Sequence, residues 1–166
     1  MENFSDAREP LEQKVGRLLN ERNLIISCAE SCTGGLLTSR LTDVAGSSVY
    51  VKGSVVCYTN EIKKSFVGVP QNILDEFGAV SEQTALCLAD GIRKKFSTDI
   101  GVGVTGLAGP GGGTKEKPVG LVFIAVSGEK GTVASRNIFA GDRAEIKSAA
   151  VEKALSMLED YLSQGT

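Results

Sequence analysis

The stretch of residues 24–44, LIISCAESCTGGLLTSRLTDV, decides the fold of this chain. Its first six residues are apolar and rich in β-formers, which predicts a short buried strand over residues 24–29. Gly34 and Gly35 predict a tight turn, and the periodic apolar positions over residues 36–44 predict a helix. A strand, a turn and a helix in this order favour an α/β domain.

The remaining elements are predicted from the same two periodicities. Apolar residues at helical spacing predict helices over residues 10–22, 60–68, 71–78, 81–96 and 142–162. Short apolar runs bounded by turn residues predict further strands within 49–58, 100–105, 120–127 and 132–139. The last two strands are joined by the turn SGEKG, which predicts a hairpin and therefore one antiparallel strand. We expect a single domain over residues 1–166, with three α/β/α layers around a mixed, mostly parallel sheet.

The composition excludes several classes of function. The 166 residues include 42% hydrophobic and 23% charged residues, with a formal net charge of −2. There is no excess of Lys and Arg, so we expect no nucleic-acid or membrane partner. The N-terminal stretch is polar and acidic, unlike a signal peptide, and the cysteines form no CxxC pair. These features predict a cytoplasmic protein whose Cys28, Cys32, Cys57 and Cys87 are reduced core thiols.

The chain contains no histidine. This absence removes the Ser-His-Asp and Cys-His catalytic arrangements and the HExxH metal motif. Without histidine, the cysteines alone lack the spacing of a zinc site, so we expect no metal centre. Any hydrolysis must use another base, and the known alternative for a serine nucleophile is a neutral lysine.

Ser31 is a candidate nucleophile because it follows the first strand. Open α/β sheets bind ligands at the carboxyl ends of their strands, and the N–H groups of the following helical turn would face a developing oxyanion. On spacing alone, Ser31 or Thr33 could equally serve as a helix cap. Cys32 is a rival nucleophile, although the sequence names no cationic partner that would hold it as a thiolate.

The segment YTNEIKK supplies the candidate base. Lys63 and Lys64 follow Tyr58 at the end of the predicted second strand. Adjacent residues of a helix point about 100° apart, so at most one of the two lysines enters a site. A pair of solvated lysines is the alternative that spacing alone favours.

A loop rich in glycine and proline, LAGPGGGTKEKPVG, spans residues 107–120. Successive unhindered N–H groups can form an anion-binding concavity, to which Lys115, Lys117 and Arg143 would add charge. The loop lacks the order of a P-loop or of a dinucleotide fingerprint, so neither ATP hydrolysis nor NAD binding follows. A flexible solvent-exposed loop is the competing interpretation.

Six blocks of sequence, in order, resemble one known family. They are CAESCTGG at 28–35, TDVAGSS at 42–48, YTNEIK at 58–63, GAVSEQTA at 78–85, VTGLAGPGGGTKEKPVG at 104–120 and FAGDR at 139–143. Together they resemble the CinA C-terminal domain family, the nicotinamide-nucleotide amidohydrolases. The resemblance covers nearly the whole chain.

The resemblance implies hydrolysis of the carboxamide of nicotinamide mononucleotide (NMN) to nicotinic acid mononucleotide and ammonia, in pyridine-nucleotide salvage. It implies Ser31 as nucleophile, Lys63 as base and Tyr58 as an aid to proton transfer, without a cofactor. The implied substrate-binding residues are Thr33, Gly34, Ser48, Thr105, Gly109, Gly112, Gly113 and Arg143. The first two would form the oxyanion-binding turn, and the others would bind the ribose phosphate. The family also suggests a homodimer.

A second hypothesis comes from another class of function. The domain could be a catalytically silent nucleotide-binding regulator linked to competence or DNA damage. The presence of Ser31, Tyr58 and Lys63 together argues against this alternative, because a binding module does not need all three. An amidase acting on a related nicotinamide-like or pterin-like amide is a third possibility. In either enzyme, Lys63 must be neutral to accept the serine proton, which requires a pKa well below about 10.4.

Overall fold

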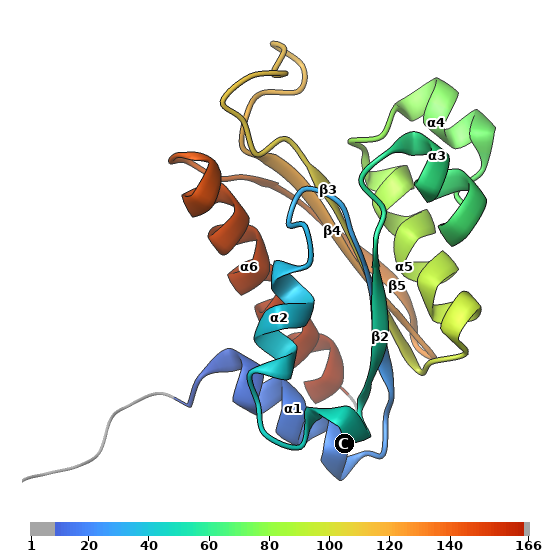
Figure 1. Ribbon diagram of the computed structural model, residues 1–166, viewed down its shortest axis with the longest axis vertical. Coiled ribbons are helices and arrows are strands. Elements are labelled where there is room, and N and C mark those ends of the chain that lie inside the picture. The colour runs from blue at the N-terminus through green and yellow to red at the C-terminus, as the bar shows by residue number, and fades with distance from the viewer. Residues whose placement is uncertain (1–8, 165–166) are drawn as a thin grey trace, which may run out of the picture.

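The computed structural model describes residues 9–164, in which five strands form one sheet in the order β2-β1-β3-β4-β5 (Figure 1). The strands are β1 (Ile26–Glu30), β2 (Val51–Val56), β3 (Ile100–Gly106), β4 (Leu121–Gly128) and β5 (Gly131–Ile138). Strand β1 is parallel to β2 and β3, whereas β4 is antiparallel to both β3 and β5. One strand therefore runs against the other four, as the predicted hairpin requires.

Helices cover both faces of the sheet. They are α1 (Leu11–Glu21), α2 (Leu36–Thr42), α3 (Asn60–Ile62), α4 (Gln71–Phe77), α5 (Glu82–Phe96) and α6 (Arg143–Ser163), with a 3₁₀ turn η1 (Ser47–Val49) and a π-helical turn η2 (Lys63–Val67). Helices α1, α2 and α6 lie on one face, and α3, α4 and α5 lie on the other (Figure 1). The three-layer α/β/α prediction is confirmed. Over residues 9–164, no helix has the length and apolarity needed to cross a membrane.

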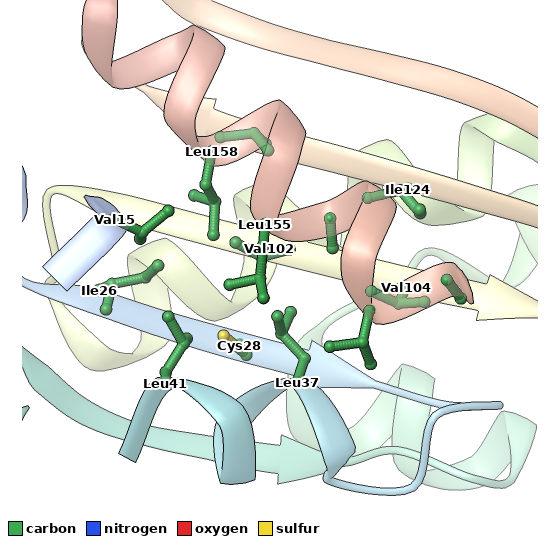
Figure 2. Packing of buried hydrophobic residues seen from close by; sticks show 14 of the residues in the cluster. Val15, Ile26, Cys28, Leu37, Leu41, Val102, Val104, Ile124, Leu155 and Leu158 are labelled. Carbon is green, nitrogen blue, oxygen red and sulfur yellow. The ribbon is translucent and has the colours of Figure 1, made fainter. Parts of the chain in front are cut away.

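The larger hydrophobic core lies between the sheet and helices α1, α2 and α6. Figure 2 shows Leu41 of α2, Ile26 of β1 and Leu158 of α6 within this cluster, and all three side chains are fully buried. On the other face, smaller clusters join α5 to the sheet and to the segment after β2. The polar N-terminal stretch, whose sequence is unlike a signal peptide, lies mostly outside the described residues.

The backbone of α5 packs closely against two glycines of strand β3. A β-carbon on Gly103 would lie 2.5 Å from the carbonyl oxygen of Ala85, and one on Gly101 would collide with that of Ala89. Only glycine leaves room for the helix backbone at these two positions. Helix α5 therefore rests directly on the central strand.

The parallel strands end together at one edge of the sheet. Glu30 of β1 lies in register with Val56 of β2 and with Val104 of β3. The residues that follow, Ser31, Cys57 and Thr105, consequently meet at this edge, where parallel sheets bind their ligands. The elements that matter for the site are thus the turn after β1, the segment after β2 and the loop after β3.

Candidate active site

The turn over residues 31–35 presents Ser31 at the carboxyl edge of the sheet. The N–H of Ser31 donates to the carbonyl oxygen of Val104 at 3.0 Å, which ties the turn to β3. Gly34 and Gly35 have φ angles of +61° and +99°, a region that favours glycine. This backbone reverses the chain and starts α2 at Leu36, several residues after the serine.

Glu30 anchors this turn from inside the protein. Its carboxylate is fully buried and accepts four hydrogen bonds, two on each oxygen. Oε1 accepts from the hydroxyl of Thr33 at 2.7 Å and from the N–H of Leu37 at 2.9 Å. Oε2 accepts from the N–H of Thr38 at 3.0 Å and from its hydroxyl at 2.7 Å. The carboxylate thus binds the helix N-terminus, where negative charge is favoured.

This arrangement corrects the prediction about the oxyanion donors. The N–H groups of Leu37 and Thr38 donate to Glu30 and that of Leu36 donates to the carbonyl oxygen of Thr33, so these groups of the first turn of α2 are not available to a ligand. Among residues 9–164, the N–H groups of Cys32 and Thr33 have no acceptor. These two groups directly follow Ser31 in the chain and are candidate backbone donors to an oxyanion.

Lys63 reaches Ser31 from the segment after β2. Its side chain is 1% exposed, and Nζ lies 2.9 Å from Ser31 Oγ. The same nitrogen lies 2.7 Å from the carbonyl oxygen of Cys57 and 3.5 Å from that of Tyr58. Burial lowers the pKa of the Lys63 amine below its ordinary value, because desolvation penalises the ammonium form. Lys64, by contrast, is exposed.

The segment that carries Lys63 has a defined local geometry, in which Lys63 is buried and Lys64 is exposed. Thr59 caps the start of α3 by accepting a hydrogen bond from the N–H of Ile62, and the π-helical turn η2 begins at Lys63. Such π turns occur frequently at functional sites. The N–H of Cys57 donates to the carbonyl oxygen of Glu30 at 2.8 Å, which joins this segment to β1.

The two carbonyl oxygens orient the amine. A neutral amine has two N–H donors and one lone pair, and the carbonyls of Cys57 and Tyr58 are positioned to accept the two N–H groups. The lone pair is then directed at Ser31 Oγ, which can donate its proton to it. The geometry suits transfer of the serine proton to Lys63.

Cys32 is a weaker candidate than Ser31. Its side chain is 6% exposed, and burial raises the pKa of its thiol to about 12. The thiol is therefore protonated at neutral pH, and the hydrogen-bond partner of Lys63 Nζ is the Ser31 hydroxyl. All four cysteines are free thiols. Within residues 9–164, no three Cys, Asp or Glu side chains gather as metal ligands would.

Ser31 and Lys63, which we call the dyad, line a pocket of about 220 Å³ at the edge of the sheet. Its lining includes the guanidinium of Arg143 and no carboxylate. One guanidinium nitrogen of Arg143 donates to the carbonyl oxygen of Gly109, and another donates to the hydroxyl of Tyr58 at 3.1 Å. The charge of the pocket therefore favours an anionic ligand.

Several of the predicted residues meet in this pocket. Ser31, Lys63, Tyr58, Thr105, Gly109 and Arg143 all line it. The hydroxyl of Thr105 donates to the carbonyl oxygen of Ala79 at 2.7 Å. The structure does not bring the hydroxyl of Tyr58 to the dyad, because the ring is 60% exposed and its hydroxyl faces Arg143. The structure places the Tyr58 hydroxyl against Arg143 in the pocket lining, and its role in proton transfer stays a prediction.

Other predicted residues lie outside the pocket lining. Thr33 and Gly34 belong to the turn, but the hydroxyl of Thr33 faces Glu30. Gly112 and Gly113 lie further along the glycine loop and are exposed. Lys117 donates to the carbonyl oxygen of Phe77 at 2.7 Å and so faces α4. The part of the loop that reaches the pocket is its beginning, at Gly109 and Gly111.

Ser48 is at the wrong end of the sheet for this pocket. It is exposed and precedes β2, whereas Ser31 follows β1, and the two strands are parallel. A six-residue strand separates the two edges by roughly 20 Å. The prediction that Ser48 joins the site is therefore corrected for the pocket of a single chain.

Glu30 is the residue that sequence reasoning missed. Glu30 directly precedes Ser31 in the motif CAESCTGG, and the motif alone assigns no role to its carboxylate. Its place at the end of a buried strand was the available signal, because a charged residue there needs several hydrogen-bond donors.

Comparisons with known proteins agree with the sequence blocks and the fold. Residues 8–162 match the family described as CinA C-terminal domain. A CinA-like protein of Syntrophus aciditrophicus (strain SB) is 49% identical over 164 residues, which are 98% of this chain and 39% of that protein. The chain thus spans about two fifths of the length of the curated relatives it matches.

Two solved structures are similar over their whole length. The competence/damage inducible protein CihA from Agrobacterium tumefaciens is 41% identical, with a TM-score of 0.87 over 99% of this chain and 100% of that one. A competence-damaged protein (CinA) superfamily protein from Enterobacter cloacae is 31% identical, with a TM-score of 0.90 over 98% and 99% of the two chains.

Proposed function

Because the chain belongs to the CinA C-terminal domain family, we propose that it hydrolyses the carboxamide of NMN to nicotinic acid mononucleotide and ammonia. The observation that carries this proposal is the 2.9 Å hydrogen bond between Lys63 Nζ and Ser31 Oγ, in which the lysine side chain is buried. The lowered pKa of Lys63 supports its service as a base. The chain offers no histidine for that task.

In the first half of the reaction, Ser31 Oγ attacks the carboxamide carbon and its proton passes to Lys63 Nζ. The carbonyl π electrons move onto the oxygen, and the N–H groups of Cys32 and Thr33 are the donors that would stabilise the resulting oxyanion. The tetrahedral intermediate collapses when its C–N bond breaks. The Lys63 ammonium gives its proton to the leaving nitrogen, and ammonia departs from an ester of Ser31.

The second half reverses these roles. A water molecule gives a proton to Lys63 and attacks the ester carbon, and the bond between that carbon and Ser31 Oγ breaks. Oγ recovers the proton from Lys63, and the released carboxylic acid loses its remaining proton to solvent. Each proton taken by Lys63 is returned within the same half-reaction, so the amine is neutral again at the start of the next one.

The cationic lining of the pocket supports a phosphorylated substrate. Arg143 places its guanidinium at the mouth of the pocket, and phosphate is a preferred partner for arginine. The exposed ring of Tyr58 lies at the same mouth and offers a flat surface to a pyridine ring. An unphosphorylated nucleoside would lose the first of these interactions.

Ammonia release from NMN by Ser31→Ala, Lys63→Ala and the double variant tests the proposal. If the two residues act as one unit, all three variants retain nearly the same residual rate, because removing either member disables the other. Lys64→Ala is the matched control, since it removes the exposed neighbouring lysine, and its rate is expected to equal that of the wild type. Additive losses would contradict the dyad.

Calorimetric binding separates the enzyme from a regulator. Ser31→Ala leaves the cationic lining intact, so it is expected to bind NMN without turning it over. A wild-type protein that binds NMN but releases no ammonia at any pH would replace the proposal with a nucleotide-binding regulator. Full activity in Ser31→Ala with loss in Cys32→Ala would move the nucleophile by one residue.

A further inference from the structure

Lys147 lies beside the catalytic turn without a partner. It is half-buried on α6, and its Nζ lies 3.7 Å from the position that a β-carbon would take on Gly34. It forms no hydrogen bond or ion pair with any residue in the range 9–164. A half-buried ammonium that has lost part of its hydration gains from an anionic partner.

The charge of Lys147 reaches the site. Although burial raises the pKa of the Cys32 thiol, the nearby ammonium of Lys147 acts in the opposite direction. Lys147 also follows Arg143 by four residues on the same helix, so the two side chains lie on one face, a turn apart. Arg143 lines the pocket, and Lys147 continues the cationic surface toward Gly34.

The pocket at Ser31 is smaller than pockets that hold whole drug-sized ligands, so a nucleotide would also contact residues beyond it. Pockets that hold drug-sized ligands occupy about 300–1,000 Å³. The cavity at Ser31 measures about 220 Å³, so a nucleotide with its carboxamide at Ser31 must extend beyond it. Lys117 of the glycine loop does not serve that extension, because its ammonium donates to the carbonyl oxygen of Phe77.

We infer that Lys147 and Arg143 form a phosphate subsite on α6, in which Lys147 sets the preference for a phosphorylated substrate over the corresponding nucleoside. The inference rests on the proposed function for the identity of the substrate. Gly34 keeps the path between the catalytic turn and the subsite open, because any side chain there would approach the ammonium group. Lys147 takes no part in bond making at the carboxamide.

The test compares Lys147→Gln and Lys147→Arg with the wild type on NMN and nicotinamide riboside. Lys147→Gln is expected to lower kcat/KM for NMN about tenfold or more through KM, and to leave the riboside unchanged, because only a charge-assisted contact is lost. Lys147→Arg is expected to retain most of the preference. Lys130→Gln is the matched control, since this exposed lysine lies in the turn between β4 and β5, at the opposite edge of the sheet. Equal losses on both substrates, or no loss on either, would overturn the inference.

A second readout does not require turnover. Inorganic phosphate is expected to raise the Tm of the wild type and of Ser31→Ala more than that of either protein carrying Lys147→Gln. If no ammonia is released but this dependence on Lys147 persists, the proposed function fails and the subsite stands. If ammonia is released normally and phosphate stabilises the Lys147→Gln protein as well as the wild type, the subsite fails and the proposed function stands.

Discussion

Lys63 is a lysine that the fold buries without a carboxylate partner among the described residues. Its side chain is 1% exposed, and its hydrogen-bond partners are a hydroxyl and two carbonyl oxygens. Burial lowers its pKa in the folded state, whereas the unfolded chain keeps a value of about 10.4. Between these two values the unfolded state binds more protons, so the free energy of unfolding rises with pH.

Replacing Lys63 with methionine should remove this pH dependence. We expect the stability of the wild type, relative to Lys63→Met, to be lowest below the depressed pKa and to rise until about pH 10.4, by about 1.4 kcal/mol for each unit of pKa lowering. Urea unfolding at a series of pH values measures the difference. Lys64→Met, which alters the exposed neighbour, should parallel the wild type. Parallel curves for wild type and Lys63→Met would contradict the argument.

Glu30 gives a second prediction for a single residue. In Glu30→Gln, an amide NH₂ would replace one oxygen and would face donors that it cannot satisfy. We expect a loss of about 2–4 kcal/mol in the free energy of unfolding, with lower amidase activity because the Ser31 turn loses its anchor. Urea unfolding and ammonia release measure both effects. Glu61→Gln, an exposed control, should leave both unchanged, and an equally stable Glu30→Gln protein would refute the anchoring role.

At this scale the sequence predicted which side chains meet in the candidate site better than which residues hold them in place. The absence of histidine and the order of the motifs pointed to Ser31 and Lys63, which the structure brings within hydrogen-bond distance. The roles of Glu30 and of the Tyr58 hydroxyl depend on which donors the folded chain places around them. That information comes from tertiary contacts and has no local sequence signal.

At the scale of elements, the packing of α5 against β3 leaves no room for a larger side chain at Gly103. Gly103→Ala would place a β-carbon 2.5 Å from the Ala85 carbonyl oxygen and 2.7 Å from the Ala89 nitrogen, so the helix must shift. We expect a loss of about 2–3 kcal/mol in the free energy of unfolding, measured by urea unfolding. Gly111→Ala is the control, because a β-carbon there would meet no atom within 4 Å. Equal stability of the two variants would show that the helix can move freely.

The elements themselves were largely predictable. Strands and long helices fall where their periodicities placed them, and the segment after β2 is helical as expected, with a π-helical turn that periodicity does not indicate. Helix α2 begins at Leu36 as predicted, directly after the two glycines in left-handed conformations, and ends at Thr42, two residues before the predicted end. The loop over residues 107–120 was predicted as a loop, but its sequence did not indicate which of its glycines would reach the pocket.

At the scale of the whole molecule, topology decided which motifs could meet. The strand order β2-β1-β3 brings the ends of three parallel strands together, and the same order sends Ser48 to the opposite edge. Ser48 precedes β2 and Ser31 follows β1, so in these parallel strands the two lie at opposite edges, whereas the resemblance alone places both in one site. Homodimer formation stays a prediction.

The position of β2 has a consequence for how the protein loses activity. This strand pairs only with β1, its residues are half-buried or exposed, and the segment that carries Lys63 follows it directly. Edge elements with little buried surface detach at lower free energy than central strands. We expect the amide hydrogens of β2 to exchange faster than those of β3. We also expect urea to abolish activity at a lower concentration than it unfolds the whole domain. If loss of activity and global unfolding occurred at the same urea concentration, local detachment of β2 would be contradicted. Transient fraying of one peripheral strand would then separate base from nucleophile while the rest of the domain stays folded.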